Sequence, residues 1–119
     1  MTSELLDLTE LKEKLRQFAQ EREWEIYHNP KNLSMALTVE SAELMEIFQW
    51  LTAEETQELS VENKHKVSEE LADILLYTIR LADRLNISLS QAAQEKLIKN
   101  AKKYPVEKAR GNAKKYHDL

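Results

Sequence analysis

The shortage of residues that turn or break a chain is the feature that most restricts this fold. The 119 residues contain one Gly and two Pro, too few for the many tight turns of a β-sandwich or barrel. The same shortage excludes the Gly-rich loops that hold phosphates in P-loop and dinucleotide-binding proteins. Apolar residues instead recur at helical spacing through most of the chain. We therefore expect an all-α protein, and the length favours one domain over residues 1–119.

The composition removes several further classes of protein. The chain has no Cys, which excludes disulfides, Cys-ligated metal centres and thiol nucleophiles. Lys and Arg number 17 against 21 Asp and Glu, so the net charge is −4 and we expect no nucleic-acid partner. No apolar run reaches the length of a membrane span, and the first residues lack the features of a signal peptide. We expect a cytoplasmic protein without a membrane partner.

Caps and helix breakers divide the chain into four expected helices. Pro30 and Pro105 interrupt the apolar patterns, because proline and the residue before it resist helical geometry. Thr52–Glu55 and Ser88–Gln91 have the spacing of capping boxes, which begin helices. The polar stretch 56–66 is the expected flexible connection. These signals predict helices over residues 8–24, 32–51, 67–85 and 89–104, arranged as an antiparallel four-helix bundle.

The second expected helix is apolar around more of its circumference than one small bundle can cover. Besides a stripe that contains Leu33 and Leu37, it carries Met35, Ala42 and Met45. Apolar surface that a single chain leaves exposed is typical of subunit interfaces. The pattern therefore indicates a homo-oligomer.

Two pairs of acidic residues occur where these helices should be least polar. Glu40 and Glu43 lie in the second expected helix, and Glu70 and Asp73 lie in the third. Residues three apart on a helix differ by about 60° around its axis, so the members of each pair point the same way. Glu40 occupies a position in the apolar stripe of its helix, where unpaired carboxylates are costly. A divalent cation would relieve this cost, and oxygen ligands suit Mg²⁺, with Mn²⁺ as a substitute.

At these residues the chain resembles a known family. Glu40-x-x-Glu43, followed by Glu70-x-x-Asp73, is similar to the metal motif of the MazG-like superfamily of all-α nucleoside triphosphate pyrophosphohydrolases. The resemblance extends over residues 18–119 and includes Phe18–Trp24, Phe48–Trp50 and Lys103–Pro105. It implies Mg²⁺-dependent cleavage between the α and β phosphates, which releases a monophosphate and pyrophosphate. The leading substrate that it implies is dCTP or a modified form of dCTP.

The resemblance also implies roles for individual residues. Glu40, Glu43, Glu70 and Asp73 would bind Mg²⁺, and one of them would activate the attacking water. Positions that match the family's triphosphate-binding segment, together with the basic tail, are Lys96, Asn100, Lys103, Tyr104, Arg110 and Lys115. Positions expected around the base and sugar are Trp24, His28, Asn32, Trp50 and Tyr77. Sites of this family form between subunits, and a tetramer built from two dimers is expected, with a dimer as the smaller option.

Three other functions agree with parts of the sequence. A nucleoside triphosphate pyrophosphatase of broad specificity would use the same carboxylates without preferring cytosine. Glu25-x-x-His28 and Glu62-x-x-His65 have the spacing of di-iron bundle proteins, although neither pair joins an apolar stripe. A non-catalytic helical interaction module would use its acidic residues in salt bridges and would bind no nucleotide. Metal preference and nucleotide hydrolysis distinguish these alternatives.

Overall fold

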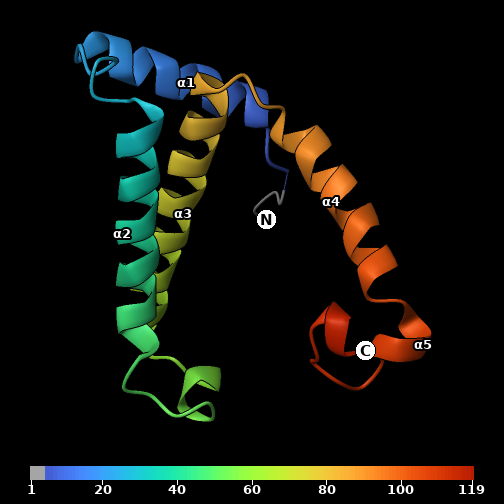
Figure 1. Cartoon of the computed structure of the whole chain (residues 1–119). Coiled ribbons are helices and arrows are strands. Elements are labelled where there is room, and N and C mark those ends of the chain that lie inside the picture. Colours follow the sequence, from blue (N-terminus) through green and yellow to red (C-terminus); the bar gives the residue numbers. More distant parts are fainter. Residues whose placement is uncertain (1–4) are drawn as a thin grey trace. The chain divides into compact units, whose positions relative to one another are not determined.

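The computed structural model describes residues 5–119, and this part of the chain forms five α-helices and two short 3₁₀ helices (Figure 1). The prediction of an all-α fold is confirmed. Residues 1–4, which enter the expectation about a signal peptide, lie outside the described part. None of the helices described is both long enough and apolar enough to cross a lipid bilayer.

The chain divides into two compact units that meet between Asn86 and Ile87 in the sequence. The helices of the first unit are α1 (Leu8–Glu21), α2 (Pro30–Phe48), η1 (Glu55–Gln57) and α3 (Val61–Arg84). The helices of the second unit are α4 (Leu89–Lys103), α5 (Val106–Ala109) and η2 (Tyr116–Asp118). Within the first unit, α2 and α3 lie side by side and antiparallel, and α1 packs on α3 across one end of the pair (Figure 1).

The buried apolar side chains of the first unit come from all three of its α-helices. They are Ala19, Leu33, Ile79 and Ala82. Since α2 begins beside the end of α3, these residues belong to the end of the helix pair that α1 crosses (Figure 1). Full burial of a side chain such as Leu or Ile contributes about 1.5–3 kcal/mol. Arg80 follows Ile79 and is only 4% exposed, so this core also contains a charge that must be paired.

The third helix begins earlier than the apolar pattern predicts. The Ser60 hydroxyl accepts a hydrogen bond from the backbone N–H of Asn63 at 3.1 Å, and α3 therefore begins at Val61. The prediction of a flexible connection is wrong for residues 61–66, which are helical. An exposed ion pair between Glu62 and Lys66, and a contact between His65 and Glu69, both four residues apart, support this polar first part of the helix.

The two predicted capping boxes differ in completeness. Thr52 and Glu55 exchange both hydrogen bonds, at 3.1 and 3.0 Å, which confirms the box ahead of η1. The Ser88 hydroxyl accepts from the backbone N–H of Gln91 at 3.2 Å, which confirms Ser88 as the cap of α4. The Gln91 side chain does not close that box, because it donates to Glu95 instead.

The end of α1 determines where the aromatic residues after it lie. Glu23 has the left-handed backbone conformation (φ 55°) that glycine usually adopts after a helix. The N–H of Trp24 donates to the carbonyl of Ala19, and the N–H of Glu23 donates to that of Gln20, as in a Schellman motif. The Trp24 ring then meets the Phe18 ring edge-on, with centroids 5.8 Å apart. The helix therefore ends before its predicted boundary, and Trp24 turns back onto it.

Candidate functional site

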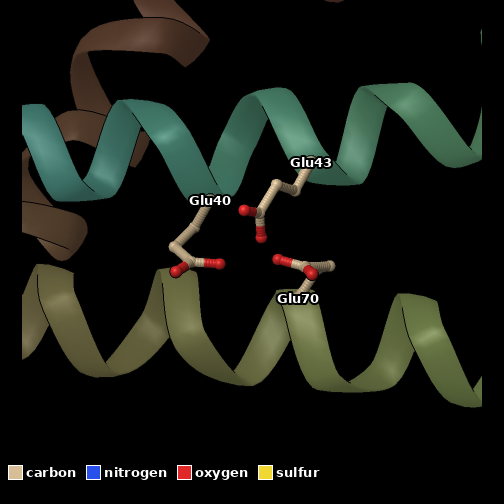
Figure 2. A group of neighbouring side chains, drawn as sticks. All are labelled: Glu40, Glu43 and Glu70. Carbon is tan, nitrogen blue, oxygen red and sulfur yellow. The ribbon is translucent and has the colours of Figure 1, made fainter.

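Three of the four predicted metal ligands converge between α2 and α3. Glu40 and Glu43 point from α2 toward Glu70 on α3, and one carboxylate oxygen of each lies within 4.8 Å of the other two (Figure 2). Oε2 of Glu70 is buried and has no hydrogen-bond partner among the described residues. A buried acceptor without a donor is costly. A hard divalent cation would satisfy this oxygen, so the side chains present fit such an ion.

The proximity of these carboxylates changes their affinity for protons. The pKa of Glu40 is raised to about 7, chiefly because its protonated carboxyl group can donate a hydrogen bond to the neighbouring Glu70 carboxylate. Burial of Glu40, a hydrogen bond with Glu43, and the negative charges of Glu43 and Asp73 raise it further. The cluster without metal therefore holds a proton near neutral pH, which a bound cation would displace.

The stability of the metal-free protein is expected to depend on pH through Glu40. Because the folded-state pKa lies above the ordinary value of 4.5, the folded state binds more protons than the unfolded state between pH 4.5 and about 7. The contribution of Glu40 to the free energy of unfolding therefore falls as the pH rises through this window. The pKa of His28 is lowered in the fold, so the contribution of His28 to the free energy of unfolding rises with pH, opposite to that of Glu40. A variant of Glu40 is therefore needed to isolate the contribution of Glu40.

Thermal unfolding of Glu40→Gln without metal provides that comparison. Between about pH 5.5 and 7.5, the variant should lose less stability than the wild type, because Gln does not titrate. Glu46→Gln, on the same helix and outside the cluster, is the matched control and should behave as the wild type. Identical pH dependence in Glu40→Gln and the wild type would show that Glu40 keeps an ordinary pKa.

A cavity of about 360 Å³ adjoins the carboxylates. Its walls come from α1, from α3 and from the loop between α1 and α2, and they consist of Leu15, Phe18, Trp24, His28, Asp73, Leu76, Tyr77 and Arg80. The rings of Trp24 and His28 are tilted, with centroids 6.1 Å apart. Asp73 lines the cavity and its charge also raises the pKa of Glu40, so Asp73 links the cavity electrostatically to the carboxylate cluster. A planar ligand in the cavity could thus extend an attached group toward the carboxylates.

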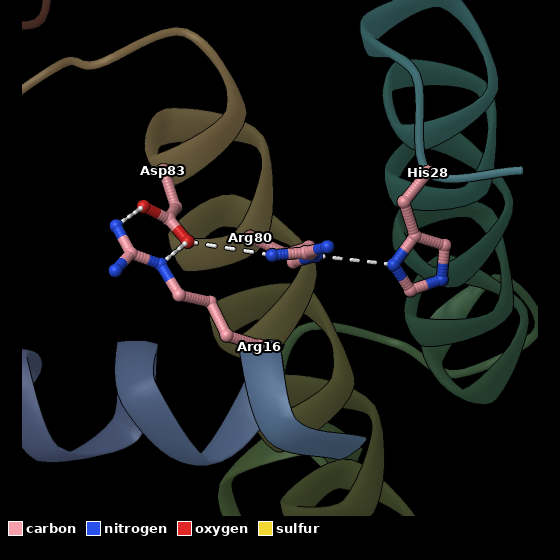
Figure 3. A network of polar contacts seen from close by, with 4 residues as sticks. All are labelled: Arg16, His28, Arg80 and Asp83. Atoms are coloured by element: carbon pink, nitrogen blue, oxygen red, sulfur yellow. Dashed lines mark hydrogen bonds and ion pairs between the residues drawn. The ribbon is translucent and has the colours of Figure 1, made fainter. Parts of the chain in front are cut away.

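A polar network centred on the buried side chains of Arg80 and Asp83 reaches the cavity wall through Arg80 and His28 (Figure 3). Nε–H of Arg80 donates to Nδ1 of His28 at 3.1 Å, and Nη1 donates to Asp83 at 3.3 Å. Arg16 donates to both oxygens of the Asp83 carboxylate, at 2.7 and 2.6 Å. The hydrogen bond with Arg16 is the main cause that lowers the pKa of Asp83. Burial lowers the pKa of His28, and the charges of Arg80 and Arg84 lower it further.

The sequence patterns do not single out Arg80, Asp83 or Phe18 as site residues. Arg80-x-x-Asp83 lies in a stretch of α3 that is otherwise rich in apolar residues, including Ile79 and Ala82. An arginine and an aspartate one helical turn apart on a buried face are unusual, and this spacing is the signal that could have revealed the pair.

Three of the five residues predicted around a base and sugar line the cavity: Trp24, His28 and Tyr77. Asn32 and Trp50 are not among its lining residues. The Asn32 side chain donates to the carbonyl of Tyr27 at 3.1 Å, so it fixes the start of α2. Trp50 follows α2 and is 87% exposed.

The residues predicted to bind a triphosphate all belong to the second unit. They are Lys96, Asn100, Lys103, Tyr104, Arg110 and Lys115. The ammonium group of Lys103 lies 4.9 Å from the centre of the Tyr116 ring, and Tyr104 meets the same ring edge-on at 6.3 Å. These contacts order the end of α4 relative to the following segment. The phosphate-binding role of the six residues stays a prediction.

Comparison with known proteins agrees with the carboxylate motif. A family model described as MazG-like matches residues 35–119, which contain both carboxylate pairs. The protein dCTP pyrophosphatase 1 is 46% identical in Bos taurus and 41% in Homo sapiens, over 105 residues that cover 87% of this chain. The chain spans 62% of the length of these curated relatives.

A solved structure is also similar to this chain. A pyrophosphatase from Archaeoglobus fulgidus superposes on the chain with a TM-score of 0.79 at 40% sequence identity. The superposition covers 88% of this chain and 98% of the archaeal one, so the likeness extends over nearly the whole fold of that protein. The chain belongs to the MazG-like family.

Proposed function

We propose that this chain is a Mg²⁺-dependent nucleoside triphosphate pyrophosphohydrolase that cleaves the bond between the α and β phosphates. The observation that carries the proposal is the convergence of Glu40, Glu43 and Glu70 beside an aromatic cavity. The names of the relatives, dCTP pyrophosphatase 1 and an archaeal pyrophosphatase, support the reaction class. The proposed substrate is dCTP or a modified form of dCTP, and the proposed location is the cytoplasm.

The proposed metal ligands are Glu40, Glu43, Glu70 and Asp73, with Mg²⁺ as the ion and Mn²⁺ as a substitute. When bound, a divalent cation neutralises phosphate charge and makes a nearby water easier to deprotonate. Water is the proposed nucleophile, because the chain has no Cys and none of its Ser residues stands out as a nucleophile, and one of the four carboxylates orients or deprotonates that water. The carboxylates alone would repel a triphosphate, so substrate binding should require the cation.

The cavity suits the base and sugar of a nucleotide. Its volume of about 360 Å³ falls within the range of small-molecule sites, about 300–1,000 Å³. Trp24 and Tyr77 offer aromatic faces for stacking, and His28 offers a polar edge. Asp73 is part of this lining and its charge acts on Glu40, so a base and sugar bound in the cavity would leave the phosphates on the side of the carboxylates.

The proposed phosphate ligands belong to the second unit, and a neighbouring subunit would contribute to the proposed site. The basic residues of α4 and the tail, with Asn100 and Tyr104, are the proposed phosphate ligands. Met35, Val39 and Met45 on α2 are each more than half exposed, which supports a homo-oligomer. The proposed assembly is a tetramer of two dimers, in which Asn32 and Trp50 are available to a partner's site.

Pyrophosphate release from the eight common ribo- and deoxynucleoside triphosphates, with Mg²⁺, tests this function. We expect hydrolysis with the highest kcat/KM for dCTP. Equal rates for all bases would support the broad-specificity alternative instead. Oxidation of Fe²⁺ by oxygen, without hydrolysis, would favour the di-iron alternative. No hydrolysis of any substrate by the folded protein, with Mg²⁺ or Mn²⁺, would contradict the proposal and favour the interaction module.

A further inference from the structure

His28 is held in one protonation form by a buried arginine. A guanidinium group can only donate hydrogen bonds, so Nδ1 of His28, which accepts from Nε–H of Arg80 at 3.1 Å, carries no proton. An imidazole with a bare Nδ1 is neutral and carries its single proton on Nε2. Figure 3 shows the other ring nitrogen on the side away from Arg80.

Arg80 has little freedom to release this histidine. Its side chain is 4% exposed, and Nη1 is paired with Asp83, whose side chain is 5% exposed. Arg16 binds both oxygens of Asp83 from α1, so the position of Arg80 depends on the packing of α1 against α3. The network thus connects the helix packing of the first unit to the protonation of one cavity residue (Figure 3).

The free nitrogen of His28 is available to a ligand. His28 lines the cavity, and within residues 5–119 its Nε2 has no hydrogen-bond partner. The charged groups around this ring and its arginine are Arg80, Asp83 and Arg84 on α3, Arg16 on α1 and Glu25 in the loop before His28. The positive charges of Arg80 and Arg84 lower the pKa of His28, in agreement with a neutral ring.

We propose that Arg80 is a positioning residue that holds His28 as a neutral hydrogen-bond donor, so that the cavity selects a ligand with an oxygen or nitrogen acceptor at this point. The acceptor belongs to the base or sugar of a nucleotide, which rests on the proposed function. The protonation form itself depends only on the contacts of Arg80 and His28. It can therefore be tested without a ligand.

The test is ¹⁵N NMR of the histidine ring nitrogens near pH 7.5. In the wild type, His28 should show a protonated Nε2 and a bare Nδ1. Arg80→Lys keeps the positive charge but removes the fixed Nε–H donor, and it should give a mixture of both tautomers. Arg84→Gln is the matched control: it removes a nearby charge but no hydrogen bond to His28, so the tautomer should stay fixed.

Kinetics with dCTP and Mg²⁺ then test the consequence for the ligand. Loss of one oriented hydrogen bond should raise KM about tenfold in Arg80→Lys, with kcat changed by less than about threefold. Arg84→Gln should leave both constants unchanged. A released tautomer with unchanged KM would overturn the selection of the ligand by His28.

The inference and the proposed function can fail separately. A proton on Nδ1 in the wild type, or a tautomer that stays fixed in Arg80→Lys, would overturn the role of Arg80 even in an active enzyme. A tautomer that is fixed in the wild type and released in Arg80→Lys would support that role even if no nucleotide were hydrolysed. In that case only the proposed function would fail.

Discussion

Glu43→Gln is expected to remove nucleotide hydrolysis while leaving the fold intact. Gln keeps the shape of the side chain but loses the charge, and Glu43 is one of three carboxylates that converge on the proposed ion. Mutating residues that only support metal ligands typically costs about 10–100-fold in affinity or activity. Loss of a ligand itself should therefore lower kcat/KM by at least about a hundredfold, measured by pyrophosphate release from dCTP with Mg²⁺.

The same variant should unfold at an equal or higher temperature than the wild type in the absence of metal. Glu43 raises the pKa of Glu40 through a hydrogen bond and through its charge, so its removal relieves repulsion inside the cluster. Glu46→Gln is the matched control on α2 and should retain activity. A Glu43→Gln enzyme with the activity of the wild type would show that this carboxylate does not take part in hydrolysis.

Asp83→Asn is expected to cause the largest loss of stability among the variants considered. The side chains of Asp83 and Arg80 are 5% and 4% exposed, and the substitution would leave two arginines without their negative partner. Breaking a buried ion pair from one side costs about 3–5 kcal/mol. That is a large part of the 5–15 kcal/mol typical of a whole domain, and it should lower the melting temperature by roughly 10 °C or more.

An exposed ion pair provides the comparison for Asp83. Glu10→Gln removes the partner of Lys14 in a pair whose side chains are 67% and 58% exposed, and it should cost less than about 1 kcal/mol. The pKa of Asp83 is lowered in the fold, so its contribution is present above the ordinary value of 3.8 and is lost as the pH falls through the folded-state pKa. Equal effects of the two substitutions near pH 7 would contradict a structural role for the buried network.

The carboxylate cluster could be predicted because helical geometry converts spacing into direction. Residues three apart point the same way once the helix is given, and Glu40 stood out in an apolar stripe. The third helix begins earlier than predicted because its first part is stabilised by the Ser60 cap and by the exposed ion pair of Glu62 and Lys66, and these polar residues leave no apolar period to detect. The presence of α3 could therefore be predicted from apolar spacing, whereas its first residue depends on the hydrogen bond of the Ser60 cap.

Two parts of the candidate site could not be predicted from local patterns. Trp24 reaches the cavity because Glu23 adopts a backbone conformation that is usual for glycine, and the sequence contains no glycine there. The network of Arg80 joins residues that are 52 and 67 positions apart in the sequence, so it exists only after the three helices pack. The spacing of Arg80 and Asp83 indicates that these two residues pair, but it does not indicate that Arg80 also holds His28.

Identification of the products formed from dCTP and Mg²⁺, by ³¹P NMR, tests the proposed reaction most directly. Cleavage between the α and β phosphates should give dCMP and pyrophosphate in equal amounts, with no inorganic phosphate as a first product. Formation of dCDP and phosphate would contradict the proposed reaction, because it would place the attack at the γ phosphate.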